Sequence, residues 1–277
     1  MSEYKLIAFD VDGTLLNSQK KISPATAAAI REAAHKGKEV ALSTGRSLAE
    51  CEEFFQVIPE FRYLILSSGA VVYDRKKEEI IFSKPIPKEA ADLLLDISEE
   101  QDIMQQMFEV YQPFMPAEKM SRLEDYEMGI YQKLFEKTMK PVEDVRAYYE
   151  KNQPELMKFN FYHRTPAARE VTRERILKTG LPLEVVYSET TSIECNAMGI
   201  SKGLGLRMLC EKTGIKPEET IAVGDADNDV EILKAAGLAI AMGNAREHVK
   251  EICDVIVADN DHDGCKEAVE ILLGGLL

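Results

Sequence analysis

The sequence has no long apolar run and few of the residues that form disulfides or bind zinc. No stretch approaches the roughly 20 apolar residues that cross a bilayer, and Asp10 and Asp12 fall where a signal peptide requires apolar residues. The five cysteines are an odd number without a CxxC pair, and the four histidines have no metal-ligand spacing. We therefore expect a cytoplasmic protein without membrane contact, disulfide framework or zinc knuckle.

Basic residues are also in deficit. The chain has 34 Lys and Arg against 48 Asp and Glu, a net charge of −14 that repels phosphodiester backbones. Hydrophobic residues make up 45% of the 277 residues, which is ordinary globular composition and enough for one large or two smaller domains. We expect no nucleic-acid partner and a monomer or weak homo-oligomer.

Strands alternate with helices at both ends of the chain. This alternation predicts an α/β fold with a Rossmann-like, doubly wound parallel sheet. The expected strands cover 5–9, 39–43, 63–66, 192–195, 220–223, 238–241 and 255–257, with a hairpin of 71–73 and 80–82. The expected helices begin at Ser23-Pro24, 47, Ser201 and 228, and Gly37 and Gly214 end two of them.

The middle of the chain has a different pattern. We expect a helix over 87–99, a strand over 103–111, a long helical stretch over 116–151, and then strands at 158–163 and 183–187 around a helix from Thr165. This pattern predicts an α+β domain at 86–187, inserted into a discontinuous core of 1–85 and 188–277.

Polar loops directly follow several predicted strands of the core. They are Asp10-Val11-Asp12, Thr44-Gly45, Ser67-Ser68-Gly69 and Gly224 to Asp229. The carboxyl ends of parallel strands lie along one edge, where ligands bind. The clustered carboxylates there would repel one another unless a cation neutralised them, and hard oxygen donors favour Mg²⁺. Such a site suits phosphoryl transfer.

Five ordered motifs resemble the haloacid dehalogenase superfamily, and within it the Cof-type phosphatases. They are DVDGTL at 10–15, STGR at 43–46, SKG at 201–203, GDADND at 224–229 and NDHDG at 260–264. The resemblance covers about 85 residues at each end of the chain. It implies that 86–187 is a C2-type cap, inserted between the second and third motifs, that governs substrate selectivity.

The resemblance also implies a role for each matching residue. Asp10 would be the nucleophile that becomes an aspartyl phosphate, and Asp12 the general acid and base. Asp10, Asp12 through its backbone carbonyl, and Asp225 would hold Mg²⁺, with Asp229 orienting them. The residues expected to bind phosphate are Thr44, Gly45, Lys202 and Asn228.

These observations predict a Mg²⁺-dependent phosphatase of small metabolites, such as a sugar phosphate or a cofactor-like phosphate. A sugar phosphomutase would use the same aspartate chemistry, and a non-enzymatic phospho-accepting or binding protein is a third reading. Ser68 departs from the family, which usually has Asn before Gly69-Ala70. We expect an altered substrate or backbone contact at Ser68 and unchanged core chemistry.

The predicted strand at 158–162 alternates polar and apolar residues. Lys158, Asn160 and Tyr162 share one face, and Phe159 and Phe161 share the other. If helices cover the apolar face, the polar face is free to bind hydroxyls of the leaving group through Lys158 or Asn160. The alternative is a polar face that is merely solvated.

Overall fold

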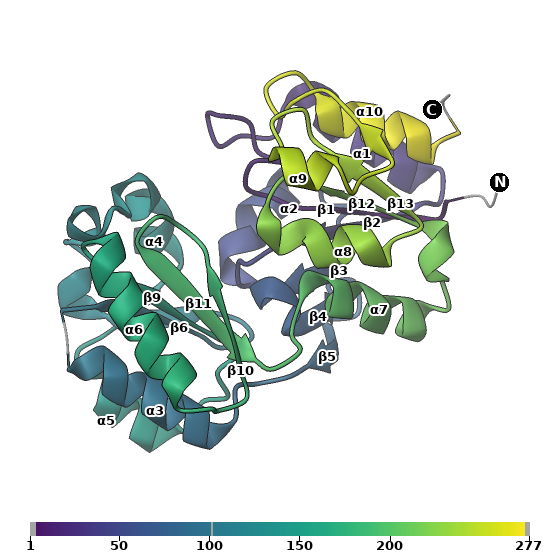
Figure 1. The fold of residues 1–277 in the computed structure, drawn as a ribbon. Helices are drawn as coiled ribbons and strands as arrows, with labels where there is room; N and C mark the ends of the chain where they lie inside the picture. Colours follow the sequence, from purple (N-terminus) through teal and green to yellow (C-terminus); the bar gives the residue numbers. More distant parts are fainter. Residues whose placement is uncertain (1–3, 101, 275–277) are drawn as a thin grey trace. The chain divides into compact units, whose positions relative to one another are not determined.

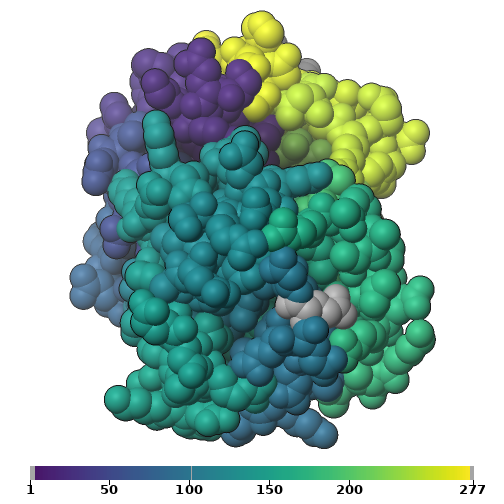
Figure 2. Space-filling model, turned by 90° about the vertical axis from the view of Figure 1, so that its left-hand side faces the viewer, coloured from purple at the N-terminus to yellow at the C-terminus, as the bar shows by residue number. Residues whose placement is uncertain are grey.

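The computed structural model describes residues 4–100 and 102–274. The chain divides into two compact units. The core unit comprises residues up to 46, 51–83 and those from 201 onward, and the inserted unit comprises 47–50 and 84–200. The described segments near the start and the end of the sequence, purple and yellow in Figure 2, lie side by side in the core unit.

The core unit is built on an eight-stranded sheet with the order β14-β13-β12-β1-β2-β3-β4-β5 (Figure 1). The six strands from β14 to β3 are parallel, and β4 and β5 add an antiparallel edge. The strands are β1 (Leu6–Phe9), β2 (Glu39–Ser43), β3 (Tyr63–Leu66), β4 (Val71–Asp74), β5 (Glu79–Ser83), β12 (Thr220–Gly224), β13 (Leu238–Ala241) and β14 (Val255–Ile256).

Helices cover both faces of this sheet, as the predicted doubly wound fold requires. Helices α1 and α10 lie together on one face, and α7 and α8 lie together on the other (Figure 1). The helices of this unit are α1 (Pro24–His35), α2 (Glu52–Val57), α7 (Lys202–Thr213), α8 (Val230–Ala235), α9 (Glu247–Lys250) and α10 (Gly264–Leu272). All four residues of β1 are buried between the two layers.

The predicted caps fix where two of these helices begin. The hydroxyl of Ser23 accepts a hydrogen bond from the Thr26 N–H ahead of α1. The hydroxyl of Ser201 accepts one from the Leu204 N–H, which sets the start of α7. Gly214 ends α7 in the left-handed conformation that glycine adopts most easily.

The inserted unit has a six-stranded sheet with the order β10-β11-β9-β6-β7-β8. One face packs against helices through a large apolar cluster. The strands are β6 (Met104–Phe108), β7 (Pro113–Pro116), β8 (Lys140–Val142), β9 (Lys158–Tyr162), β10 (Leu183–Tyr187) and β11 (Ser192–Ala197). The helices are α3 (Lys88–Glu99), α4 (Gln132–Thr138), α5 (Val145–Asn152) and α6 (Pro166–Lys178).

The prediction of one long helical stretch over 116–151 is wrong. That stretch holds short 3₁₀ turns at Ala117–Lys119, Leu123–Tyr126 and Gly129–Tyr131, and then α4, β8 and α5. Pro141 cannot donate a helical hydrogen bond, and it lies instead in β8 at the edge of the sheet. The strand expected over 103–111 ends at Phe108 for β6, and β7 returns antiparallel to it.

The second domain boundary also differs from the expected one. The sequence predicts a core strand at 192–195, but β11 (Ser192–Ala197) pairs with β9 and β10 in the sheet of the inserted unit. The inserted unit therefore ends at Ile200 and not at 187. Pairing between distant strands decides this boundary, and alternation of strands and helices does not reveal it.

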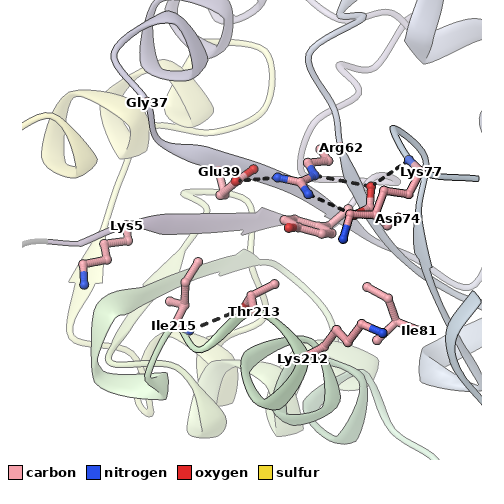
Figure 3. A pocket seen from close by; sticks show the side chains of 11 residues that line it. Lys5, Gly37, Glu39, Arg62, Asp74, Lys77, Ile81, Lys212, Thr213 and Ile215 are labelled. Atoms are coloured by element: carbon pink, nitrogen blue, oxygen red, sulfur yellow. Dashed lines mark hydrogen bonds and ion pairs between the residues drawn. The ribbon is translucent and has the colours of Figure 1, made fainter. Parts of the chain in front are cut away.

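A cavity of about 470 Å³ opens at the amino-terminal edge of the core sheet, the edge away from the loops that follow the parallel strands (Figure 3). Its charged lining is largely paired. Arg62 donates to Asp74 at 3.0 Å and to Glu39 at 2.9 Å. Arg62 and Asp74 thus form an arginine–aspartate pair at the edge of the sheet opposite to the predicted site. Among the described residues, no helix is both long enough and apolar enough to span a membrane.

Candidate active site

The loops after β1, β2, β3 and β12 meet at the carboxyl edge of the core sheet, because these strands are parallel. They contain 10–14, 44–46, 67–69 and 225–229. The first turn of α7 adds Lys202 to the same place, since its ammonium contacts two of the loops. Residues that lie far apart in the sequence thus form one polar cluster.

Lys202 is the cationic centre of this cluster. Its Nζ donates to Oδ1 of Asp10 at 2.6 Å and to Oδ1 of Asp229 at 2.7 Å. The Lys202 and Asp229 side chains are fully buried, and that of Asp10 is nearly so. Burial alone would lower the pKa of Lys202, but the two carboxylates outweigh it and raise this pKa. The lysine is therefore held in its charged form.

The second oxygen of Asp229 is also engaged. Its Oδ2 accepts from the backbone N–H of Asp225 at 3.0 Å and from that of Ala226 at 3.1 Å. Asp229 therefore ties Lys202 to the loop that carries Asp225. The orienting role that the family resemblance implies for Asp229 stays a prediction.

The Asp225 carboxylate contacts the loop that follows β1. The Thr14 hydroxyl donates to Asp225 Oδ1 at 2.7 Å. Gly13 has φ +88°, and a Cβ there would lie 2.5 Å from Asp225 Oδ2. Only glycine combines this backbone conformation with such a close approach. Gly13 thus permits the first loop to pass directly beside the Asp225 carboxylate.

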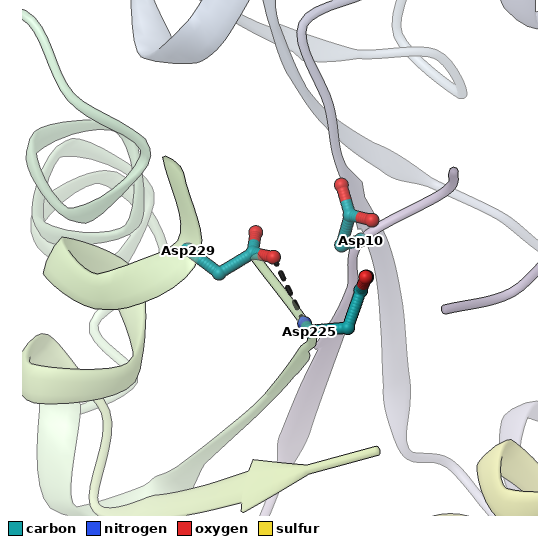
Figure 4. A group of neighbouring side chains, drawn as sticks. All are labelled: Asp10, Asp225 and Asp229. Atoms are coloured by element: carbon teal, nitrogen blue, oxygen red, sulfur yellow. Dashed lines mark hydrogen bonds between the residues drawn. The ribbon is translucent and has the colours of Figure 1, made fainter. Parts of the chain in front are cut away.

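The carboxylates of Asp10, Asp225 and Asp229 each place an oxygen within 4.8 Å of the others (Figure 4). Burial, and then the Asp229 charge, raise the pKa of Asp10 well above its ordinary value, although Lys202 opposes the shift. Burial also raises the pKa of Asp225 to about 6. Three carboxylates face one lysine, so their full ionisation puts more negative charge in the cluster than Lys202 balances. Such a set of oxygen donors fits a hard divalent cation.

Asp12 lies two residues beyond Asp10 but has different partners. Its carboxylate accepts from Arg46 Nε at 2.9 Å, from Arg46 Nη2 at 2.9 Å and from Lys20 Nζ at 3.1 Å. Burial alone would raise the pKa of Asp12, but these cations outweigh it and lower this pKa. The two aspartates of the DxD motif thus occupy opposite electrostatic environments.

The loop after β3 holds three consecutive residues with positive φ: Ser67 at 49°, Ser68 at 60° and Gly69 at 101°. The Ser67 N–H donates to the Arg46 carbonyl, and the Ser68 N–H donates to the Thr44 carbonyl. A Cβ on Gly69 would lie 2.0 Å from the Ser201 carbonyl oxygen, so this loop is seated against the start of α7. The backbone of Ser67–Gly69 therefore links the loop after β2 to the helix that carries Lys202.

The residues expected to hold phosphate differ in their surroundings. Thr44 is buried, and its hydroxyl accepts from the Arg46 N–H at 3.2 Å. Gly45, beside it, is half-buried. Asn228 is exposed, although its neighbour Asp229 is fully buried. The contacts that join Asp10, Lys202, Asp225 and Asp229 do not include Asn228.

Arg46 is a site residue to which the sequence analysis gave no role, as are Lys20 and Thr14. The signal was its place as the last residue of the STGR motif, directly after the loop that follows β2. Its importance comes from the parallel pairing of β1 with β2, which brings the loop carrying Asp12 beside the loop carrying Arg46.

In the inserted unit, the polar face of β9 is buried and not solvated. Lys158, Asn160 and Tyr162 are 2%, 3% and 4% exposed. Asn160 Nδ2 donates to the Tyr162 hydroxyl at 2.9 Å, and Lys158 pairs with Glu194 at 3.2 Å. Within the described residues, Asn160 Oδ1 is a buried acceptor without a hydrogen-bond donor. The face is therefore a polar interior with one unmet acceptor.

Comparison with known proteins agrees with this architecture. The family model of haloacid dehalogenase-like hydrolases matches residues 7–269. The chain is 31% identical over 269 residues to the 5-amino-6-(5-phospho-D-ribitylamino)uracil phosphatase YcsE of Bacillus subtilis, covering 96% of this chain and 95% of that protein.

Solved structures are similar over nearly the whole chain. A haloacid dehalogenase-like hydrolase from Bacteroides thetaiotaomicron superposes with a TM-score of 0.85 at 26% identity, over 98% of this chain and 100% of that one. The subclass IIB sugar phosphatase BT4131 superposes with a TM-score of 0.80 at 25% identity, over 98% and 99%. The chain therefore belongs to the haloacid dehalogenase-like hydrolases, and among them to the Cof-type phosphatases.

Proposed function

We propose that the protein is a Mg²⁺-dependent phosphatase that hydrolyses phosphomonoesters of small metabolites through an aspartyl-phosphate intermediate. The observation that carries this proposal is the contact of the buried Asp10 carboxylate with Lys202, beside Asp225 and Asp229. A carboxylate nucleophile needs positive charge around it to meet a phosphate dianion, and this cluster supplies a fixed cation at its centre.

The first half of the reaction uses both aspartates of the first loop. An oxygen of Asp10 attacks phosphorus, the bond between phosphorus and the ester oxygen breaks, and that oxygen takes a proton from Asp12 to leave as an alcohol. The product of this step is the Asp10 acyl phosphate.

In the second half, water attacks phosphorus of the acyl phosphate and gives its proton to Asp12. The bond between phosphorus and Asp10 breaks, and inorganic phosphate leaves. The Arg46 and Lys20 cations lower the pKa of Asp12. They thus stabilise the ionised carboxylate that accepts a proton from water in this half, and they make the protonated form that acts in the first half a stronger acid. Each cycle thus returns both aspartates to their starting states.

Asp10, Asp225 and the backbone carbonyl of Asp12 would hold Mg²⁺. Asp229 would orient these ligands without binding the ion itself. A divalent cation there supplies charge neutralisation for the transferring phosphoryl group. The protein's own part is to fix the donors: Thr14 and Asp229 hold the loop of Asp225, and Lys202 holds Asp10. We assign the phosphate oxygens to Thr44, Gly45, Lys202 and Asn228.

For the substrate we propose a phosphorylated sugar, polyol or cofactor-like metabolite. One relative acts, by its name, on a phosphoribityl compound, and a structural neighbour is a sugar phosphatase. A phosphoribityl compound and a sugar phosphate both bear hydroxyl groups beside the phosphate ester. The inserted unit, residues 84–200, is the part that we expect to select among such substrates.

The proposal is tested by incubating the purified protein with a panel of phosphorylated sugars, polyols and cofactors, with phosphate release as the readout. Release should require Mg²⁺, stop with chelator and be absent in Asp10→Asn. A phosphomutase would instead isomerise a sugar phosphate with little free phosphate. No release from any member, or release that persists in Asp10→Asn, would overturn the proposal.

A further inference from the structure

We propose that Arg46 is a positioning residue that fixes the Asp12 carboxyl group for proton transfer to the leaving oxygen and from the attacking water. This inference rests on the proposed phosphatase function. Its basis is the two-point contact in which Arg46 Nε donates to Asp12 Oδ2 and Nη2 donates to Oδ1, each at 2.9 Å. A fork that grips both oxygens fixes the plane of the carboxyl group, which a single hydrogen bond does not.

Arg46 is itself held in place independently of Asp12. Its N–H donates to the Thr44 hydroxyl at 3.2 Å, and its carbonyl accepts from the Ser67 N–H at 2.9 Å. Its guanidinium lies over the Phe54 ring, 5.2 Å from the centroid, and its side chain is only 10% exposed. The arginine is therefore a preorganised support, built from the loops after β2 and β3 and from α2.

Asp12 needs such a support more than Asp10 does. The Asp12 side chain is 34% exposed, whereas that of Asp10 is 8% exposed and is gripped by buried Lys202. The Asp12 carboxylate also accepts from Lys20, whose side chain is 50% exposed and whose Nζ lies 3.1 Å from Oδ1. A flexible, hydrated ammonium holds position weakly, so Arg46 decides where the carboxyl group points.

A positioning role predicts a specific kinetic signature. Aryl phosphates leave as stable phenoxides and need little protonation, whereas alkyl phosphates leave as alkoxides and need a proton in the transition state. Arg46→Ala should therefore lower kcat for an alkyl phosphate by about 10²-fold, near the lower end of what general acid catalysis contributes, and for 4-nitrophenyl phosphate by only about threefold. The Mg²⁺ concentration for half-maximal rate should stay unchanged.

A double-mutant cycle separates this role from direct phosphate binding. In the Asp12→Asn background there is no proton to place, so removing Arg46 should change kcat by less than about threefold. Arg46→Lys keeps the charge but loses the fork, and it should recover only part of the alkyl phosphate rate. Arg46→Gln is a second variant to use if Arg46→Ala unfolds.

Arg62→Ala is the matched control. Arg62 makes the same kind of two-point contact, to Asp74 at 3.3 and 3.0 Å, but at the opposite edge of the core sheet. Its loss should leave the ratio of alkyl to aryl rates as in the wild type. Equal losses on both substrates for the Arg46 variants, or losses that add to that of Asp12→Asn, would overturn the inference, as would no loss on either substrate. Failure of the proposed function is a separate result, because there the wild type itself releases no phosphate.

Discussion

The ammonium of Lys202 lies 2.6 Å from Oδ1 of Asp10, and both side chains are shielded from solvent. Lys202 is the first residue of α7, where the positive end of the helix dipole disfavours a cation. The carboxylates of Asp10 and Asp229 compensate for this placement. The lysine is thus part of a buried charge cluster and not a solvated helix residue.

Lys202→Met should destabilise the metal-free protein and abolish turnover. The variant leaves two buried carboxylates without their cation, which costs about 3–5 kcal/mol in the free energy of unfolding. Urea unfolding followed by circular dichroism measures this loss. Lys212→Met, in the same helix, removes an exposed pair with Glu79 and should cost less than about 1 kcal/mol. Similar losses for both variants would contradict the buried-cluster account.

Stabilisation by Mg²⁺ should depend on pH. Because burial raises the pKa of Asp225 to about 6, the stabilisation from its bound proton is complete below its ordinary value of 3.8 and is lost as the pH rises through 6. Asp10, with its raised pKa, acts in the same direction. At about pH 8 the cation should therefore raise Tm clearly, and at about pH 5 much less, since protons then compete with it. A Tm increment that is equal at both pH values would contradict a carboxylate site.

Gly69→Ala should impair the protein far more than Gly37→Ala does. Both glycines have positive φ, but a Cβ on Gly69 meets the Ser201 carbonyl at 2.0 Å, whereas one on Gly37 meets nothing within 4 Å. Gly37→Ala should cost about 1 kcal/mol from backbone strain alone. Gly69→Ala adds a clash that shifts Lys202, so both Tm and kcat should fall further. Equal effects of the two substitutions would remove the proposed link between the β3 loop and α7.

Ser68→Asn tests the departure from the family pattern. Ser68 has φ 60°, and asparagine tolerates this left-handed conformation better than serine does. We expect a gain of a few tenths of a kcal/mol in thermal or urea unfolding and an unchanged kcat. A large loss of activity would mean that the Ser68 side chain contacts substrate.

Asn160→Ala should lower selectivity for hydroxylated substrates. The unmet acceptor Oδ1 of Asn160 is buried, so it meets a substrate hydroxyl only where substrate binding uncovers it, and one such bond then corresponds to about tenfold in kcat/KM. Hydrolysis of 4-nitrophenyl phosphate should change little, because it has no hydroxyl to donate. Phe159→Leu, on the other face of β9, is the control for misfolding of the inserted unit and should affect both substrates equally. No selective loss for Asn160→Ala or Lys158→Ala would return this polar face to a structural role.

Local patterns were sufficient to predict the core fold. Strand and helix alternate there, and Ser23, Ser201 and Gly214 mark helix ends through their own side chains or backbone freedom. The inserted unit is different, because short turns between 117 and 131 carry no periodicity that separates them from a helix. The assignment of β11 depends on pairing with β9, a long-range contact that local sequence does not encode.

In the candidate site, too, some features could be predicted from local sequence and others depend on tertiary contacts. Parallel strands bring their following loops to one edge, so the gathering of Asp10, Thr44 and Asp225 followed from topology alone. The grip of Arg46 on Asp12 did not, since it depends on rotamers and on the support of Phe54. Burial of Asn160 depends likewise on tertiary packing.

The most direct test of the account is where phosphate becomes covalently attached. Asp12→Asn retains the attacking oxygen but loses the proton shuttle, so an aryl phosphate with a good leaving group should phosphorylate it faster than the acyl phosphate hydrolyses. Acid quenching followed by peptide mass spectrometry should find one added phosphoryl group on Asp10, and none in the Asp10→Asn/Asp12→Asn double variant. A wild-type enzyme that turns over normally while no phosphoryl group is ever trapped on Asp10, or one that is found on another residue, would contradict the proposed mechanism.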